Sequence, residues 1–145
     1  MKNWTFRQWN TVLGWVIFAI AFITYLSTIE PNFSFWDCGE YISSAVKLEV
    51  THAPGAALFQ IVGAVAGIFA FGNGENYSVV INAMSALFSA FTILFLFWTI
   101  THLVRRLLNK DFEEVTKHQE IAILFSGVIG ALCFTFSDTF WFSAV

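Results

Sequence analysis

Charge is scarce in this sequence. Asp, Glu, Lys and Arg make up 12% of the 145 residues, whereas 57% of the residues are hydrophobic. A soluble domain typically has about 25% charged residues, so this chain has too little charge to cover a water-soluble fold. The net charge is −3, and no basic cluster of the kind that binds nucleic acid is present. Both observations favour a membrane protein with no nucleic-acid partner.

Cysteine is also scarce, and the common catalytic motifs are missing. The two cysteines, Cys38 and Cys133, stand in no CxxC or Cys/His spacing, which argues against a disulfide framework or a zinc site. The sequence contains no P-loop, no GxSxG and no HExxH. It therefore offers none of the local patterns for nucleotide binding, serine hydrolysis or zinc peptidase chemistry.

Long uncharged stretches are what the chain has instead. Three segments are predicted to span a membrane, at residues 11–29, 77–104 and 121–136. At about 1.5 Å per residue, the first two are long enough to cross a hydrocarbon layer of about 30 Å. The first exceeds the apolar region of about 7–15 residues in a signal peptide, so we expect a retained anchor. The fold class predicted is all-α, a single polytopic transmembrane region over residues 1–145.

The segment between the first two spans has a different pattern. Residues 37–49 are amphipathic at helical spacing, and residues 56–71 are apolar except for Gln60. Basic residues precede the first span and follow the second, so both of these ends are expected in the cytoplasm. The chain must then cross the membrane an even number of times between these two basic ends, and the first two spans already make two crossings. We therefore expect residues 30–76 to lie outside the cytoplasm, with two helices in the membrane interface; a re-entrant segment satisfies the same count.

Two acids in this outer loop are candidates for chemistry. Asp37 and Glu40 stand three residues apart beside aromatic residues. A partly desolvated carboxylate can act as a general base, because burial raises its pKa toward neutral pH. The same spacing fits a capping box, in which Asp37 begins a helix and Glu40 completes the cap. Capping alone is the favoured interpretation of these two residues, although one acid can cap while the other faces a site.

The remaining polar residues have simple alternatives. His52 can contact a phosphate or lie in a solvated turn, and the solvated turn is slightly preferred. Lys47 can pair with a lipid phosphate or simply form a solvated helix face. Asn82, Ser85 and Ser89 share one helical face, which is typical of packing between membrane helices.

Three stretches of the sequence resemble a known family. They read SFWDCGEYI at 34–42, KLEVTHAPGAALF at 47–59 and SDTFWFSAV at 137–145. They are similar to the N-terminus of a bacterial membrane family catalogued as domain of unknown function 2723 and grouped as glycosyltransferase family 117. That family is related to the protein O-mannosyltransferases. The resemblance covers nearly the whole chain.

This resemblance implies a GT-C type fold and a sugar transfer. Such enzymes move a sugar from a polyprenyl-phosphate carrier in the lipid bilayer to an acceptor outside the cytoplasm. Asp37 matches the acid that acts as general base, and Glu40 matches the second acid. His52, Pro54 and Gly55 match the turn that follows, and we expect them to bind substrate. Lys47 and His52 are the basic candidates for the phosphate left on the carrier.

Several expectations remain open at this level. No metal ligand set or cofactor is assigned, and a divalent metal is left open; the acceptor and the sugar are unspecified. The resemblance implies the N-terminal part of a longer protein in a bacterial inner membrane, with a cytoplasmic N-terminus and no activity of the 145 residues alone. The rival hypotheses are a non-catalytic membrane scaffold or subunit and, ranked last, a transporter fragment, which would need charges within its spans.

Overall fold

Every regular element in the described part of the chain is a helix, which confirms the predicted all-α class. The computed structural model describes residues 5–32, 37–108 and 115–145. The helices, in chain order, are α1 (Phe6–Thr28), α2 (Cys38–Lys47), α3 (Ala57–Gly67), η1 (Ile68–Ala70), α4 (Asn76–Leu108), α5 (Lys117–Thr135) and α6 (Asp138–Ala144). The first three residues of the SFWDCGEYI stretch, residues 34–36, lie outside the described residues.

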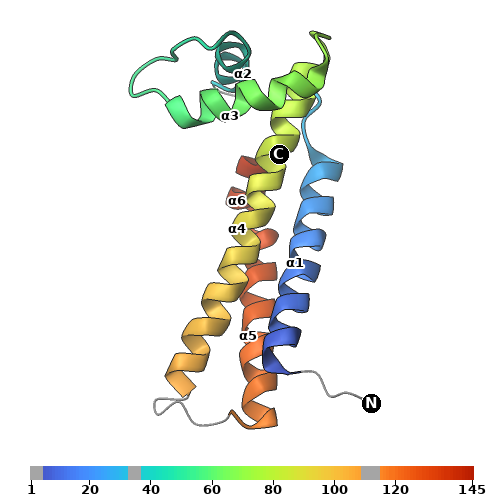
Figure 1. Cartoon of the computed structure of the whole chain (residues 1–145), viewed down its shortest axis with the longest axis vertical. Coiled ribbons are helices and arrows are strands. Elements are labelled where there is room, and N and C mark those ends of the chain that lie inside the picture. Colours follow the sequence, from blue (N-terminus) through green and yellow to red (C-terminus); the bar gives the residue numbers. More distant parts are fainter. Residues whose placement is uncertain (1–4, 33–36, 109–114) are drawn as a thin grey trace.

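Three of the described helices are long and apolar enough to cross a membrane: α1, α4 and α5. They contact one another along one bundle, and α1 begins at the end opposite α2 and α3 (Figure 1). Large apolar side chains point outward from all three, such as Ile23, Phe95 and Ile129, which are 59–65% exposed. A water-soluble bundle would bury such side chains, so the polytopic membrane prediction is confirmed at the level of the fold.

Two of these helices begin earlier than the predicted spans because threonines cap them. Thr5 accepts a hydrogen bond from the main-chain N–H of Gln8, and the Gln8 side chain bonds back to Thr5. Thr116 and Gln119 form the same capping box at the start of α5. A capping box satisfies N–H groups that would otherwise have no partner in the first turn. The helices therefore include polar turns that the apolar stretches did not reveal.

Small residues let the helices of the bundle approach closely. The Cα of Gly127 on α5 lies so near α4 that an added Cβ would come within 2.6 Å of Thr101 and 2.8 Å of Phe97. At the other end of the bundle, the buried Tyr25 hydroxyl of α1 donates a 3.0 Å hydrogen bond to the carbonyl of Thr135. Close packing and hydrogen bonds of this kind hold membrane helices together, because lipid gives little hydrophobic drive between them.

The short helix α6 was not predicted from the sequence. It follows α5 directly, and the indole nitrogen of Trp141 donates a 3.0 Å hydrogen bond to the Thr28 hydroxyl at the end of α1. The rings of Phe140 and Tyr25 also meet edge to face, with centroids 6.1 Å apart. Helix α6 therefore packs against the last turns of α1.

The connection from α1 to α2 is tethered to α4. The Asn82 side-chain amide donates to the carbonyls of Glu30, at 2.8 Å, and Asn32, at 3.3 Å. The Ser78 hydroxyl donates to the carbonyl of Pro31 at 2.9 Å. Asn82 is 6% exposed on α4, in keeping with the packing expected for it. Its amide in addition bonds main-chain carbonyls that Pro31 keeps out of a helix.

Helices α2 and α3 lie at one end of the bundle, and α3 runs across the direction of α4 (Figure 1). The outward face of α3 and of η1, which continues it, is apolar: Leu58, Ile61, Val65 and Ile68 are 56–75% exposed. Its inward face carries Gln60 and the small residues Gly63 and Gly67. Such an outward face suits the interfacial position predicted for residues 56–71, and that position stays a prediction.

We predict that Gly127→Val destabilises the bundle. The added side chain would overlap Thr101 and Phe97, and overpacking of this kind typically costs about 1–3 kcal/mol. Thermal unfolding of the full-length protein in detergent measures the loss. Gly74→Ala is the matched control, since no atom lies within 4 Å of a Cβ added there. Equal unfolding temperatures for Gly127→Val and wild type would contradict this packing.

We also predict that the outward face of α3 is shielded by lipid on the outer side of the membrane. In a background with Cys38 and Cys133 replaced by Ser, Glu49→Cys should react rapidly with an impermeant maleimide added to intact cells. Leu58→Cys and Ile68→Cys should react slowly, because lipid covers them. Labelling of Glu49→Cys only after the cells are broken would place this loop in the cytoplasm and contradict the predicted topology.

Candidate functional site

The two acids of the outer loop lie at the start of α2. Asp37 immediately precedes the helix, and Glu40 lies in its first turn. The Asp37 main chain has φ −84° and ψ 10°, outside the extended region that N-cap residues normally adopt, and its side chain makes no capping hydrogen bond. The predicted capping box is therefore wrong, because this main-chain conformation does not direct the carboxylate to the first turn.

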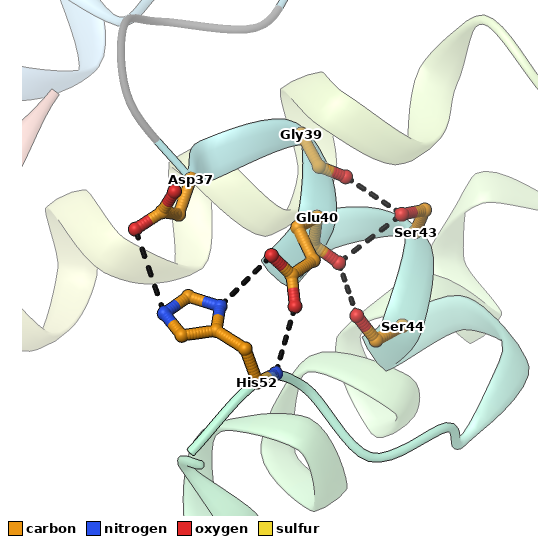
Figure 2. A network of polar contacts seen from close by, with 6 residues as sticks. All are labelled: Asp37, Gly39, Glu40, Ser43, Ser44 and His52. Carbon is orange, nitrogen blue, oxygen red and sulfur yellow. Dashed lines mark hydrogen bonds and ion pairs between the residues drawn. The ribbon is translucent and has the colours of Figure 1, made fainter. Parts of the chain in front are cut away.

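Glu40 instead binds His52, twelve residues further along the chain. One carboxylate oxygen accepts the main-chain N–H of His52 at 2.9 Å, and the other lies 2.9 Å from its Nδ1 (Figure 2). The second ring nitrogen, Nε2, lies 3.8 Å from a carboxylate oxygen of Asp37. His52 lies about half exposed in a turn, which confirms the preferred solvated-turn interpretation, and its ring is in addition held between two acids.

The chain between Glu40 and His52 is shaped to bring these residues together. Helix α2 ends where Leu48 adopts a left-handed conformation, with φ 54°. After His52, the N–H of Gly55 donates a 2.9 Å hydrogen bond to the His52 carbonyl. Gly55 has φ +75°, a conformation that favours glycine. Pro54 and Gly55 thus form the turn that fixes His52, and their predicted contact with substrate stays a prediction.

Aromatic rings line one side of this network. The Tyr41 ring meets the His52 ring edge to face, with centroids 6.3 Å apart, and meets the Phe59 ring at 5.7 Å. Tyr41 lies one residue after Glu40, so the same helical turn supplies both an acid and a ring to His52. These ring contacts limit the orientations of the imidazole.

Ser43 and Ser44 bond back to α2 itself. Ser43 donates to the carbonyl of Gly39 at 2.7 Å, and Ser44 donates to that of Glu40 (Figure 2). Ser44 is buried. Its hydroxyl can be buried because it is satisfied within the helix.

The hydrogen bonds between Glu40 and His52 shift both pKa values. The pKa of Glu40 is lowered, first by the main-chain N–H of His52 and then by the imidazole. The pKa of His52 is raised, chiefly by its hydrogen bond to Glu40 and then by the charges of Glu40 and Asp37. Each hydrogen bond favours the charged form of the group it involves. The two shifts therefore stabilise a carboxylate–imidazolium pair.

The arrangement leaves Asp37 as the accessible acid. Both oxygens of Glu40 are used by His52, whereas the Asp37 side chain is 60% exposed and meets the imidazole at the longer distance of 3.8 Å. An exposed carboxylate beside a cation can take up a proton from a hydroxyl brought next to it. Among the described residues, no group of three His, Cys, Asp or Glu side chains is arranged to hold a metal ion.

Lys47 is not part of this network. It lies exposed in the last turn of α2, at the opposite end of the helix from Asp37. The structure thus brings together Asp37, Glu40 and His52 and places Pro54 and Gly55 in the adjoining turn, whereas no hydrogen bond or ion pair joins Lys47 to any of these described residues. The predicted contact between Lys47 and a phosphate stays a prediction.

A hollow of about 370 Å³ lies on the side of α2 that faces α4. It is lined by parts of all three sequence stretches that carry the family resemblance: Cys38, Tyr41, Ile42, Ala56, Phe59, Phe142, Ser143 and Val145, together with Ile81, Asn82 and Ser85 of α4. Segments about 100 residues apart in the chain therefore meet around one cavity, and Tyr41 links that cavity to His52.

The described chain is a helical membrane bundle, and two acids lie at the start of a short helix at one end of that bundle. These features define the class: a polytopic membrane protein with a polar site outside its spanning helices. A family model described as Protein O-mannosyl-transferase TMEM260 N-terminal domain matches residues 37–145. The match covers most of the chain, and the chain belongs to this family. The expected relationship to the protein O-mannosyltransferases is thus confirmed. No solved structure matches the chain.

We predict a pH window for the Glu40–His52 pair. Because the pKa of His52 is raised from 6.5, its contribution to stability is complete below pH 6.5 and is lost as pH rises through the raised value. Because the pKa of Glu40 is lowered from 4.5, its contribution is complete above pH 4.5 and is lost as pH falls through the lowered value. The pair should therefore stabilise the fold most in the weakly acidic range between them.

Unfolding temperatures of wild type and His52→Gln, measured against pH, test this window. Their difference should be largest in the weakly acidic range and shrink on both sides. His118→Gln, which removes an exposed histidine of α5, should show no such window. A wild-type advantage over His52→Gln that does not change with pH would show that the pair is not formed.

Proposed function

We propose that this chain is the N-terminal part of a membrane glycosyltransferase of the GT-C type. In this proposal it helps to transfer a sugar from a polyprenyl-phosphate carrier to an acceptor hydroxyl on the non-cytoplasmic side of the membrane. Family membership supports a glycosyltransferase, and the accessible Asp37 beside His52 is the single observation that carries the assignment of its base. In this proposal the chain also belongs to glycosyltransferase family 117, and it lies in a bacterial inner membrane with its N-terminus in the cytoplasm.

Asp37 is the general base in this proposal. Its carboxylate accepts the proton of the acceptor hydroxyl as the hydroxyl oxygen attacks the anomeric carbon of the sugar. The bond between that carbon and the carrier phosphate oxygen breaks, and its electron pair leaves with the phosphate. Because Asp37 is 60% exposed, the proton can then pass to water and return the base to its starting form.

Glu40 and His52 act through position. Glu40 holds the His52 ring and main chain, and His52 brings a positive charge to 3.8 Å from Asp37. Charge-assisted hydrogen bonds are stronger than neutral ones, so this arrangement orients the imidazole before substrate binds. The developing charge on the carrier phosphate needs a cation, for which His52 and Lys47 are the candidates in this loop.

The position of α2 suits a donor held in lipid. A polyprenyl phosphate keeps its phosphate at the depth of the lipid head groups, so the base must lie at that depth. Asp37 lies at the start of α2, at the end of the bundle where the spanning helices α1 and α5 end and α4 begins. A helix in this place can present a carboxylate to a head group without burying the charge in hydrocarbon.

The rival scaffold hypothesis assigns the two acids to helix capping. The structure shows no capping hydrogen bond from Asp37, so that structural reason for an acid at this position is missing. A scaffold would also require that replacement of Asp37 leave glycosylation intact, and the same experiment therefore separates the two hypotheses.

We predict that Asp37→Asn in the full-length protein loses sugar transfer but still folds. Loss of a general base typically costs about 10²–10⁴-fold in rate, and the amide keeps the size of the side chain. Transfer of a labelled sugar in membranes, together with the unfolding temperature, measures both properties. Glu75→Gln, an exposed acid outside the network, should keep wild-type turnover. Wild-type turnover by Asp37→Asn would refute the assigned role.

A further inference from the structure

Charged side chains are divided between the two ends of the bundle. The described acids at the end that carries the outer loop are Glu30, Asp37, Glu40, Glu49, Glu75 and Asp138. The opposite end, where α1 and α5 begin and α4 ends, has the exposed basic residues Arg7, Arg105, Arg106 and Lys117, and we call it the basic end (Figure 1). Glu120 is the acid that the structure describes there. Opposite charges therefore gather at opposite ends of the described chain.

The basic side chains of this end have no acid as partner among the described residues. The ion pairs found in that part of the chain both involve His52, in the outer loop. Each of the four basic side chains is exposed, so its charge can meet an anion from outside the chain. Because water and salt screen exposed charges, charge alone does not select one anion over another. The surface beside these charges must therefore supply the selectivity.

The start of α1 and the end of α4 meet at the basic end. The guanidinium carbon of Arg105 lies 5.2 Å from the centroid of the Phe6 ring, close enough for an attraction between the cation and the ring. The indole nitrogen of Trp98 donates a 3.3 Å hydrogen bond to the carbonyl of Asn10. Arg7 directly follows Phe6, so two helices each bring a guanidinium group to this junction. A guanidinium group binds phosphate through paired N–H groups, and the junction therefore suits a phosphate.

A hollow of about 360 Å³ lies beside Arg7. Among the described residues it is lined by Arg7, Gln8, Thr11 and Val12, which share one side of α1. Val12, Val16 and Ile20 follow one another at four-residue spacing and are 39–47% exposed. This apolar stripe leads from the hollow toward the middle of the span. The same side of α1 is thus polar and cationic at its beginning and apolar from Val12 onward.

This order of side chains matches an anionic phospholipid of the membrane. The phosphate of such a lipid lies at the depth of the head groups, and its acyl chains extend from there into the hydrocarbon. A soluble phosphate would use Arg7 but not the apolar stripe. A phosphatidylcholine carries a cation on its own head group, which weakens its attraction to arginine. Basic residues beside the ends of spanning helices bind anionic head groups by this attraction.

We propose that the basic end binds one anionic phospholipid. Its phosphate contacts Arg7 and Arg105, and one acyl chain lies along Val12 and Val16. The lipid thus joins the start of α1 to the end of α4, at the end of the bundle opposite Asp37. This site is separate from the acids of the outer loop, and it does not depend on the proposed sugar transfer.

Arg7→Gln in the full-length protein tests this site. The probes are dioleoyl phosphatidylglycerol, which is anionic, and dioleoyl phosphatidylcholine, which has the same acyl chains and no net charge. Wild type in neutral detergent should bind phosphatidylglycerol more tightly than phosphatidylcholine, as measured by native mass spectrometry. One basic residue near an anionic lipid contributes about 1 kcal/mol, so the Kd for phosphatidylglycerol should rise about fivefold in Arg7→Gln. Arg7→Lys keeps the charge and should stay close to wild type.

Lys47→Gln is the matched control, because it removes an exposed charge at the other end of the bundle. Its Kd for phosphatidylglycerol should equal that of wild type. An equal loss of affinity in Lys47→Gln and Arg7→Gln would show a general attraction to charge and overturn the inference. Equal affinity of wild type for the two lipids would overturn it as well. So would displacement of the lipid by a similar concentration of glycerol phosphate, which has the phosphate without the acyl chains.

Discussion

The site depends on one contact, the double hydrogen bond between Glu40 and His52. The Glu40 carboxylate is hydrogen-bonded to both the main-chain N–H and the ring of His52. This double contact fixes the main chain of the loop at His52 as well as the His52 side chain. Without that contact, the turn at Pro54 and Gly55 would lose its hydrogen bonds to α2, although the rings of Tyr41 and Phe59 would still join α2 to α3. The imidazole would also lose the hydrogen bond that holds it beside Asp37. One acid is thus used for structure, which leaves the other accessible for chemistry.

The bundle gives this loop a firm base. Asn82 and Ser78 of α4 bond the carbonyls of the chain that leaves α1, so the residues directly after α1 are held against α4. Trp141 ties α6 to the end of α1, and α6 lines the cavity on the far side of α2. The ends of the long helices therefore also hold the outer loop that carries Asp37, Glu40 and His52.

The sequence predicted the helices better than it predicted the site. Apolar length is a strong signal, so the three spanning helices were found, whereas the threonine caps that extend α1 and α5 and the short α6 were missed. Asp37 and Glu40 were found as a pair, but the predicted interaction was a cap of α2, whereas Glu40 in fact bonds His52. Capping is a local pattern that a sequence can reveal, and the contact with His52 joins residues twelve positions apart. The buried Thr51 hydroxyl and Gln60 amide make no hydrogen bond within the described residues. The sequence offered no sign of this, because an unsatisfied buried group is visible only once burial and partners are known.

The central claim is that the Asp37 carboxylate itself takes the proton of the acceptor. Chemical rescue tests it most directly: turnover of full-length Asp37→Ala is measured with increasing formate, alongside Glu40→Ala. We expect formate to restore part of the turnover of Asp37→Ala, because a small carboxylate can occupy the place of the missing side chain, and to restore none of the turnover of Glu40→Ala. Wild-type turnover by Asp37→Ala without formate, or equal rescue of both variants, would contradict this claim.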